Sequence, residues 1–337
     1  MRVRWGVIGA TGIADRRTIP EGILAADNSE LAAVMSPTEK RVRAVAEKYG
    51  GVPWFTDAEE MLASVKLDAV YLASPPAFHL EQTRLCTEAG VHVFCEKPLA
   101  LTVEQAQEMV DLCRQAGVKM GTAFMIPYHC LVQRAMQFVA QGALGQVVST
   151  RVQFGFDYPP LEGAFRQSRE QHAGGAFMDV GNHAMDVLER IVGSKVRTVQ
   201  AVTANVAYEY QGVEDTCLAL LTLDNGAVGI VDAYFCTGSA RNEVEVNGTE
   251  RTLVIRGAMG QSPGGVLTVL SGFAGATEEL REESDGRSMY EGEIRAFAQA
   301  ILTDSDPPIS GDDGLWSQKL VAAVYQSAQT AQVVAVE

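Results

Sequence analysis

The sequence predicts an α/β protein that begins with a doubly wound parallel sheet and continues into an α+β domain with a large, mostly antiparallel open sheet. Over the first 125 or so residues, short strands that are apolar on both faces alternate with helical segments, as in a parallel sheet covered by helices. From Gly145 onward, longer strands and hairpin turns such as Asp224-Asn225-Gly226 predominate. We therefore expect domains at 1–125 and 126–337, with the C-terminal helix free to pack back on the first.

The individual elements follow from the same patterns. The strands expected in the first domain are Val3–Ile8, Leu31–Met35, Ala69–Ala73, Val91–Cys95 and Lys119–Ala123. The helices expected between them are Gly12–Ala25, Glu39–Tyr49, Ala58–Ser64, His79–Ala89 and Val103–Ala116. The strands expected in the second domain are Val147–Phe156, Thr198–Ala207, Cys217–Leu223, Ala227–Tyr234, Asn242–Val246 and Thr252–Arg256. Helices at Ala176–Val192, Tyr290–Leu302 and Asp312–Thr330 are expected on one face of that sheet.

Composition narrows the possible partners and the compartment. The 337 residues carry a net charge of −15, which disfavours nucleic acid and anionic membranes as partners. The N-terminus shows no signal-peptide pattern, and no apolar stretch is long enough to span a membrane. None of the six cysteines forms a CxxC pair or lies near clustered histidines, so we expect reduced thiols, no metal site and a cytoplasmic location.

The second domain is expected to mediate self-association. Cys217–Leu223 and Ala227–Phe235 are apolar on both faces, whereas helices can cover only one face of an open sheet. A second copy of the chain would cover the other face. The sequence therefore predicts a homodimer or homotetramer joined through this sheet.

A glycine turn after the first strand is the first sign of a nucleotide site. Gly9-Ala10-Thr11-Gly12-Ile13 follows that strand and opens a helix. The glycines permit a tight turn and let backbone N–H groups approach a pyrophosphate at the helix N-terminus. Its place at the first strand–helix turn predicts a Rossmann-type dinucleotide-binding domain, in preference to a simple tight turn.

The end of the second strand indicates which dinucleotide is bound. NAD-selective sites normally place Asp or Glu there to bind the ribose hydroxyls. This chain instead has Ser36, followed by Lys40 and Arg41. Hydroxyls and cations suit a 2′-phosphate, so the sequence favours NADP over NAD, which stays the alternative. These residues could also be ordinary surface charges at a helix start.

Two further strand ends offer polar groups to the same edge of the sheet. The loop Ser74-Pro75 ends the third strand, and His79 is expected to position or cap the helix that follows. Glu96 and Lys97 end the next strand. The Lys97 ammonium can hydrogen-bond a substrate oxygen and stabilise developing alkoxide charge. The alternative is a surface Glu–Lys pair, which the position at a strand end disfavours.

The helix after Gly174-Gly175 carries the other candidate catalytic groups. Asp179 and His183 fall on one helical stripe with Asp186 and Arg190, apart from the apolar stripe that faces the core. A neutral imidazole can take a proton from a hydroxyl while hydride leaves the same carbon, and Asp179 can orient the substrate or the ring. The alternative is a solvated polar face with no role.

Taken in order, these motifs resemble the glucose-fructose oxidoreductase / inositol dehydrogenase / MocA family over nearly the whole chain. The glycine turn, the Glu96-Lys97-Pro98 segment and the GG-A-x-x-D-x-G-x-H-x-x-D pattern of 174–186 carry the resemblance. Met35-Ser36 with Arg41, together with segments 212–215, 245–250 and 313–317, look most like the NADPH-dependent 1,5-anhydro-D-fructose reductases. Those enzymes have a Trp-Arg pair where this chain has Phe165-Arg166, and the segment 126–129 also differs.

The resemblance implies an NADP(H)-dependent oxidoreductase that acts on a sugar, keto-sugar or polyol. It places Lys97, Asp179 and His183 in the catalytic and substrate-binding positions, and we add Tyr290 as a further substrate contact. The expected cofactor contacts are Gly9, Ala10, Thr11, Gly12, Ile13, Ser36, Lys40, Arg41, Ser74, Pro75, His79, Glu96, Lys97 and Arg166. Two alternatives stay open, a cofactor-retaining NAD(P)-dependent glycosidase and a non-catalytic NADP-binding regulator.

Overall fold

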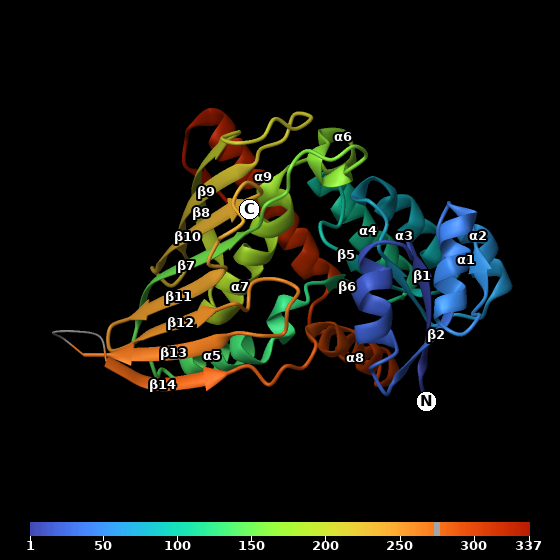
Figure 1. The fold of residues 1–337 in the computed structure, drawn as a ribbon, viewed down its shortest axis with the longest axis horizontal. Helices are drawn as coiled ribbons and strands as arrows, with labels where there is room; N and C mark the ends of the chain where they lie inside the picture. The colour runs from blue at the N-terminus through green and yellow to red at the C-terminus, as the bar shows by residue number, and fades with distance from the viewer. Residues whose placement is uncertain (273–276) are drawn as a thin grey trace. The chain divides into compact units, whose positions relative to one another are not determined.

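A computed structural model describes residues 1–272 and 277–337 of the chain (Figure 1). They form two compact units. The first comprises Met1–Met125 and Ser288–Gln318, and the second comprises Ile126–Arg287 and Lys319–Glu337. The predicted domains 1–125 and 126–337 remain a prediction; in the structure the segment Ser288–Gln318 groups with the first unit.

The sheet of the first unit has six parallel strands in the order β3-β2-β1-β4-β5-β6. The strands are β1 (Val3–Ile8), β2 (Ser29–Met35), β3 (Trp54–Phe55), β4 (Ala69–Leu72), β5 (His92–Glu96) and β6 (Met120–Ala123). This confirms the doubly wound parallel sheet, to which the structure adds the short edge strand β3. The strand order reverses between β1 and β4, and ligands of such sheets bind outside the carboxyl ends of the strands at this point.

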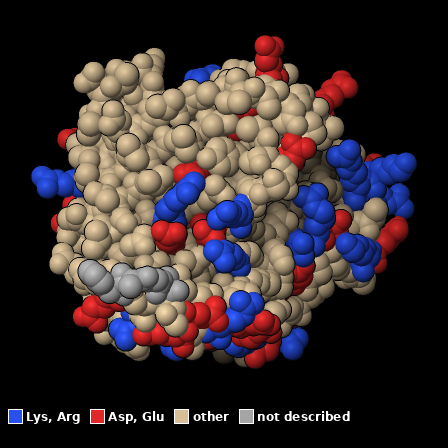
Figure 2. Space-filling view, turned by 60° about the vertical axis from the view of Figure 1, so that its left-hand side comes forward, with Lys and Arg blue, Asp and Glu red and all other residues tan. Residues whose placement is uncertain are grey.

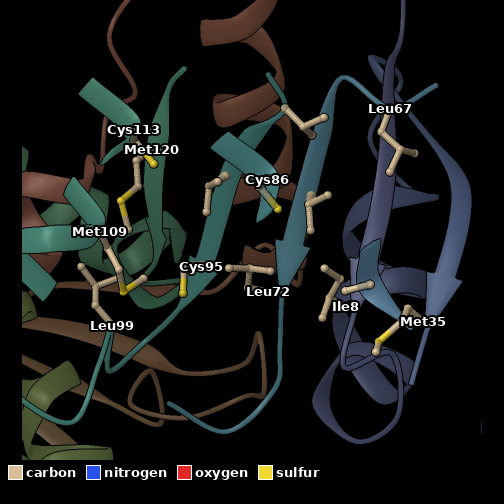
Figure 3. Close-up of a cluster of buried hydrophobic side chains, with 14 of the residues drawn as sticks. Ile8, Met35, Leu67, Leu72, Cys86, Cys95, Leu99, Met109, Cys113 and Met120 are labelled. Atoms are coloured by element: carbon tan, nitrogen blue, oxygen red, sulfur yellow. The ribbon is translucent and has the colours of Figure 1, made fainter. Parts of the chain in front are cut away.

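Helices cover both faces of this sheet, as its strands require. They are η1 (Ala14–Ile23), α1 (Glu39–Lys48), α2 (Ala58–Ser64), η2 (Pro76–Phe78), α3 (His79–Glu88), α4 (Val103–Ala116) and α8 (Met289–Leu302). Alternate residues of each strand face opposite ways. On one side Ile8, Leu72 and Cys95 pack with the side chains of α2, α3 and α4 (Figure 3). On the other side Tyr71 and Phe94 pack with η1, α1 and α8.

Aromatic packing explains why α8 belongs to the first unit. Phe297 of α8 stacks on Phe94 of β5 with ring centroids 4.7 Å apart, and it lies 5.8 Å from the ring of Trp5 on β1. All three side chains are at most 2% exposed. Burying such large rings contributes several kcal/mol, at roughly 1.5–3 kcal/mol for each side chain. The sequence alone does not show this pairing, because about 200 residues separate the two partners.

The sheet of the second unit has nine strands in the order β14-β13-β12-β11-β7-β10-β9-β8-β15, and β7 with β10 is the parallel pair. The strands are β7 (Val147–Gly155), β8 (Val196–Ala204), β9 (Thr216–Leu223), β10 (Val228–Tyr234), β11 (Glu243–Gly248), β12 (Thr252–Arg256), β13 (Val266–Ser271), β14 (Thr277–Glu283) and β15 (Val334–Ala335). The large, mostly antiparallel sheet is confirmed. The sequence analysis did not identify β13, β14 or β15.

The helices and short turns of this unit are η3 (Ile126–Tyr128), α5 (Cys130–Ala140), η4 (Phe165–Gln167), α6 (Arg169–His172), η5 (Phe177–Gly181), α7 (Asn182–Val192) and the later part of α9 (Gly311–Thr330). Helices α5 and α7 pack against one face of the sheet (Figure 1). The helix expected over 176–192 is divided between η5 and α7, and α5 was not anticipated. The predicted start of the last helix, Asp312, differs from the observed one by a single residue.

The opposite face of the sheet exposes apolar side chains. Along β9 buried and exposed residues alternate, and Leu218 and Leu220 are 45% and 55% exposed. Val202 of β8 lies opposite Leu218, and Ile230 of β10 lies opposite Leu220, and both are also exposed. Figure 2, which turns the large-sheet side forward, shows a broad area without Lys, Arg, Asp or Glu. We call the exposed side chains of Val202, Leu218, Leu220 and Ile230 the open apolar face.

Two further observations bear on the sequence-based expectations. All six cysteines are free thiols, and four of them are buried. No helix among the described residues has the length and apolarity needed to cross a membrane.

Candidate functional site

The turn between β1 and η1 has the geometry of a phosphate-binding turn. Gly9 and Gly12 have φ values of +79° and +98°, which favour glycine. A Cβ on Gly9 would lie 2.5 Å from the backbone nitrogen of Ser74, so the loop after β4 passes directly behind the turn. Nothing lies within 4 Å of a Cβ built on Gly12, so this side of the turn is open. The N–H groups of Gly9 and Ala10 both donate to the Met35 carbonyl oxygen and fix the turn to β2.

A cavity of about 600 Å³ adjoins this turn. Its lining comprises Thr11, Gly12, Asp15, Arg16, Arg41, Ala44, Val45 and Lys48. The Lys48 ammonium is bonded to the Asp15 carboxylate at 2.8 Å. Among the described residues, Arg16 and Arg41 have no ion-pair partner, so both guanidinium groups are available to an anion. The structure thus groups Thr11, Gly12 and Arg41, as the sequence analysis expected.

Ser36 and Lys40, which were also expected to contact the cofactor, do not line this cavity. Ser36 is 4% exposed, and its backbone N–H donates to the Phe55 carbonyl oxygen of β3 at 3.2 Å. Lys40 is exposed on α1 and does not contribute to the cavity lining. Arg16 takes the place that the sequence analysis gave to Lys40. The sequence already indicated this position for Arg16, because it lies one helical turn after Gly12 on the helix that the glycine turn opens.

His79 has a structural position at the start of α3. Its ring is fully buried, with Nδ1 3.0 Å from the Leu99 carbonyl oxygen and Nε2 2.8 Å from the Ser74 carbonyl oxygen. Burial lowers the pKa of His79, so the ring is neutral. The Ser74 hydroxyl donates to Gln82 at 2.5 Å. His79 therefore ties the Ser74-Pro75 loop to the segment after β5, and its ring nitrogens are engaged by backbone rather than directed at a ligand.

Glu96 and Lys97 lie where β5 ends, as the sequence predicted. Both side chains are half-buried. The Tyr71 hydroxyl of β4 donates to Glu96 Oε1 at 2.5 Å, and the Thr18 hydroxyl of η1 donates to Tyr71 at 3.1 Å. The peptide bond between Lys97 and Pro98 is cis. Hydrogen bonding thus fixes the residue that directly precedes Lys97, at the edge of the sheet where ligands bind.

Tyr290, which was expected to contact the substrate, is a buried residue in the structure. It lies at the start of α8 in the first unit and is 2% exposed. Burial raises the pKa of its phenol above the ordinary value, so the hydroxyl keeps its proton. A core position is the better description of this residue.

In the second unit, a buried carboxylate holds the start of the helix that carries Asp179 and His183. Glu214 accepts the backbone N–H groups of Gly175 at 3.0 Å and Phe177 at 2.8 Å, and the Tyr325 hydroxyl at 2.8 Å. A negative charge is favourable at a helix N-terminus, where the first N–H groups lack partners. Burial raises the pKa of Glu214 above its usual value, although these hydrogen bonds oppose the shift.

Close packing accounts for the glycine pair before this helix. A Cβ on Gly175 would lie 1.9 Å from the Glu214 carbonyl oxygen, and a Cβ on Gly174 would lie 2.1 Å from the Tyr325 hydroxyl. His172 Nδ1 also lies 2.8 Å from the Gly174 carbonyl oxygen. The sequence analysis noted Glu214 only as part of a motif, because a contact across nearly 40 residues leaves no local pattern.

The polar stripe of this helix is buried rather than solvated. Asp179, His183 and Asp186 are 6%, 4% and 9% exposed. Arg166 Nε lies 3.2 Å from Asp179 Oδ1, and Arg190 Nε bonds Asp186 at 2.7 Å. The His183 ring lies 6.1 Å from the ring of Phe154 on β7. The structure therefore pairs Arg166 with Asp179, although the two were assigned to different ligands in the sequence analysis.

Taken unit by unit, the arrangement offers two kinds of chemistry. The first unit has an open glycine turn, two guanidinium groups at the adjoining cavity and a lysine at a strand end, which fits a phosphate-bearing dinucleotide. The second unit has a buried carboxylate–guanidinium pair and an imidazole on one helix, which fits hydrogen bonding to hydroxyls and proton transfer. No group of residues with metal-ligand geometry occurs in 1–272 or 277–337.

Comparisons with known protein families match both units. Residues 3–124 match the model described as "Oxidoreductase family, NAD-binding Rossmann fold", and residues 132–254 match the GFO/IDH/MocA C-terminal domain. A 1,5-anhydro-D-fructose reductase from Ensifer adhaerens is 33% identical over 99% of this chain and 98% of its own. A D-xylose 1-dehydrogenase (NADP(+)) from Haloferax volcanii is 31% identical over 98% of each chain.

Solved structures share the fold across the whole chain. An aldose-aldose oxidoreductase from Caulobacter crescentus, complexed with glycerol, superposes with a TM-score of 0.91 over 99% of this chain and 100% of its own, at 24% identity. A levoglucosan dehydrogenase, complexed with NADH and levoglucosan, gives a TM-score of 0.87 at 22% identity, covering both chains fully.

Proposed function

The chain belongs to the GFO/IDH/MocA family of NAD(P)-dependent sugar oxidoreductases, and we propose that it transfers hydride between NADP(H) and a keto-sugar or related polyol close to 1,5-anhydro-D-fructose. The observation that carries the proposal is the presence of Lys97 at the end of β5 together with the buried Asp179 and His183 on one helix. A protein that only binds a dinucleotide has no use for all three groups.

The preference for NADP rests on the cavity beside the glycine turn. The β2 strand ends at Met35 without an acidic residue for the ribose hydroxyls. Arg16 and Arg41 line the cavity, and neither forms an ion pair with any residue that the structure describes. Two guanidinium groups can hold a 2′-phosphate by charge-assisted hydrogen bonds. The Haloferax relative, which is named for NADP(+), supports the same choice.

The reaction assigns distinct work to the residues of the two units. The bound cofactor supplies or accepts the hydride at the reacting carbon. Lys97 donates a hydrogen bond to the oxygen on that carbon and stabilises negative charge as it develops. His183 takes the hydroxyl proton when the sugar is oxidised and returns it when the carbonyl is reduced. Asp179, held by Arg166, accepts a hydrogen bond from a neighbouring hydroxyl and orients the ring.

Turnover by variants tests these roles. A panel of sugars and dicarbonyl sugars is screened with NADPH and NADP at the nicotinamide absorbance. For the best substrate, Lys97→Met and His183→Ala should each lower kcat by about 10²–10⁴-fold, the usual effect of losing a proton-transfer group. The affinity for NADPH, measured by fluorescence, should change little. Lys66→Met, at an exposed lysine of the first unit, is the matched control.

The same experiment separates the other possible functions. Hydrolysis of a glycoside without a net change in nicotinamide absorbance would instead indicate a cofactor-retaining glycosidase. NADPH binding with no turnover of any sugar would indicate a regulator. A kcat in His183→Ala within two-fold of the wild-type value, with the fold intact, would remove the mechanism.

The open apolar face supports a proposal about assembly. Val202, Leu218, Leu220 and Ile230 place exposed apolar side chains side by side on neighbouring strands. Contiguous apolar surface of this kind marks association sites. We propose that a second copy of the chain covers it, giving a dimer or tetramer. The free cysteines support a cytoplasmic location for the assembly.

A further inference from the structure

Glu293 is a buried acid that the proposed reaction does not use. It lies on α8 in the first unit and is 1% exposed. Within the described residues, neither carboxylate oxygen has a hydrogen-bond partner. A buried ionised carboxylate without hydrogen bonds or a counter-ion costs several kcal/mol. The residue is therefore either protonated or strongly destabilising.

The hydrogen bonds around Glu96 show which neighbouring group carries the negative charge. Thr18 donates to the Tyr71 oxygen, so the single phenolic proton of Tyr71 is directed to Glu96 Oε1. Burial and the charge of Glu96 raise the pKa of Tyr71 well above its ordinary value, so the phenol keeps this proton. Glu96 is the acceptor of this proton, the role that an ionised carboxylate can fill with both oxygens.

The described groups of α8 and η1 that follow are uncharged or already paired. Tyr290, one helical turn before it, is a buried phenol. On η1, which packs against α8, the Arg17 guanidinium is engaged by Glu21 at 2.5 Å, and Glu21 also accepts the Ser288 hydroxyl. Next to the charge of the half-buried Glu96, the buried and unbonded Glu293 carboxyl favours its protonated form. Burial and the Glu96 charge raise the pKa of Glu293 well above the usual range.

We propose that Glu293 holds a proton at neutral pH and acts as a positioning residue for Glu96, the ionised acid of the two, which directly precedes Lys97. A second negative charge in this cluster would repel Glu96 and loosen its bond to Tyr71. The neutral acid thus keeps the end of β5 in place. The consequence for Lys97 rests on the catalytic role proposed above, whereas the protonation of Glu293 does not.

Stability measured against pH tests the protonation directly. In the unfolded chain a glutamate carboxyl loses its proton above its ordinary pKa of about 4.3. In the folded protein a carboxyl with a raised pKa keeps that proton to higher pH. The unfolding equilibrium constant of the wild type should then rise by up to about ten-fold for each pH unit above that value, until the folded-state pKa is reached. Glu293→Gln, a neutral residue of the same shape, should lack this rise. The ratio of the two constants should therefore grow with pH in urea titrations between pH 5 and 8.

A control and a second readout keep the test independent of folding defects. Glu291→Gln is the control. It changes a carboxylate on the same helix, and this carboxylate is bonded to Arg295. The ratio of its unfolding constant to that of the wild type should not grow with pH. Infrared difference spectra of the full-length protein should show the C=O band of a protonated carboxyl at pH 7, and Glu293→Gln should lack it. In a Glu96→Gln background the pH-dependent ratio should shrink, because the repelling charge is gone.

The pH dependence of kcat tests the positioning role of Glu293. The logarithm of kcat plotted against pH should lose part of its alkaline decline in Glu293→Gln, while kcat at pH 7 stays within about two-fold of the wild-type value. A ratio of unfolding constants that does not depend on pH, or a wild-type minus Glu293→Gln infrared difference spectrum at pH 7 without a carboxyl band, would overturn the protonation. A confirmed proton with an unchanged alkaline decline would overturn the positioning role alone, and neither result bears on whether Lys97 and His183 act in turnover.

Discussion

Replacing Gly175 with alanine tests whether the glycine pair is needed for packing or for contact with a ligand. The added Cβ would lie 1.9 Å from the Glu214 carbonyl oxygen and 2.9 Å from its carbonyl carbon and backbone nitrogen. Real Cβ contacts stay above 3.0 Å, so the two backbones must separate by about 1.1 Å, the difference between 3.0 and 1.9. Side-chain rotation cannot relieve this clash, because the opposing atoms are backbone.

The cost follows from what holds Glu214. Its carbonyl oxygen accepts the Ala176 N–H at 3.1 Å, and its carboxylate accepts the N–H groups of Gly175 and Phe177. A displacement of 1 Å stretches these bonds beyond hydrogen-bond range. Overpacking costs about 1–3 kcal/mol, and each lost bond to a charged group costs about 1.5–3 kcal/mol. With one of these bonds lost, the free energy of unfolding of the second unit should fall by about 3–6 kcal/mol.

Thermal unfolding followed by circular dichroism measures this loss. At about 2–4 °C for each kcal/mol, Gly175→Ala should lower the midpoint of the second unit by roughly 6–24 °C. The affinity for NADPH should be retained, because the binding residues lie in the first unit, while kcat falls with the displaced His183. Gly238→Ala is the control, since its Cβ would lie 3.7 Å from the nearest atom, an ordinary contact. A Gly175→Ala protein as stable as this control would refute the packing argument, and a loss of kcat without a loss of stability would indicate direct contact of Gly175 with the ligand.

The remaining predictions concern the cofactor and the assembly. Arg41→Ala should weaken NADP binding by about 10- to 100-fold, the value of a charge-assisted phosphate contact, and leave NAD binding nearly unchanged. Arg16→Ala should have a smaller effect of the same kind, and equal losses for both cofactors would remove the assignment. Leu220→Glu should convert the assembly to a monomer in sedimentation at micromolar concentration, because it places a charge within the open apolar face. Leu24→Glu, at a similarly exposed leucine of the first unit, should leave the assembly intact, and a wild-type monomer would contradict the interface.

Local patterns predicted most of the first unit and the centre of the second. Strand β1 and helices α2 and α4 have the expected bounds, because apolar runs and capping residues mark them. Asp57 accepts the Glu60 N–H at the start of α2, and Gly117 ends α4 with φ of 68°. The strands that went unrecognised have mixed composition. β14 carries several charged residues, and it forms through pairing with β13 rather than through its own propensity.

The candidate site likewise has parts that local sequence patterns indicate and parts that depend on contacts between distant segments. Glycine turns and strand ends have local signals, so Gly12, Arg41 and Lys97 could be located from the sequence. Contacts between distant segments could not, and the structure supplies them: Arg166 to Asp179, and Tyr71 to Glu96. Because buried polar groups must find partners, such contacts determine which polar residues are functional and which are structural.

Two of the buried acids, Glu214 and Glu293, illustrate this distinction. Glu214 and Glu293 are equally inconspicuous in the sequence, and burial raises the pKa of both. Glu214 accepts two backbone N–H groups and a phenol, so its role in holding the start of the His183 helix is complete within the protein. Glu293 has none of these bonds. A carboxyl that the fold buries and leaves unbonded keeps its proton, and since it lies beside the Glu96 charge, that proton determines the electrostatics at the end of the strand that carries Lys97.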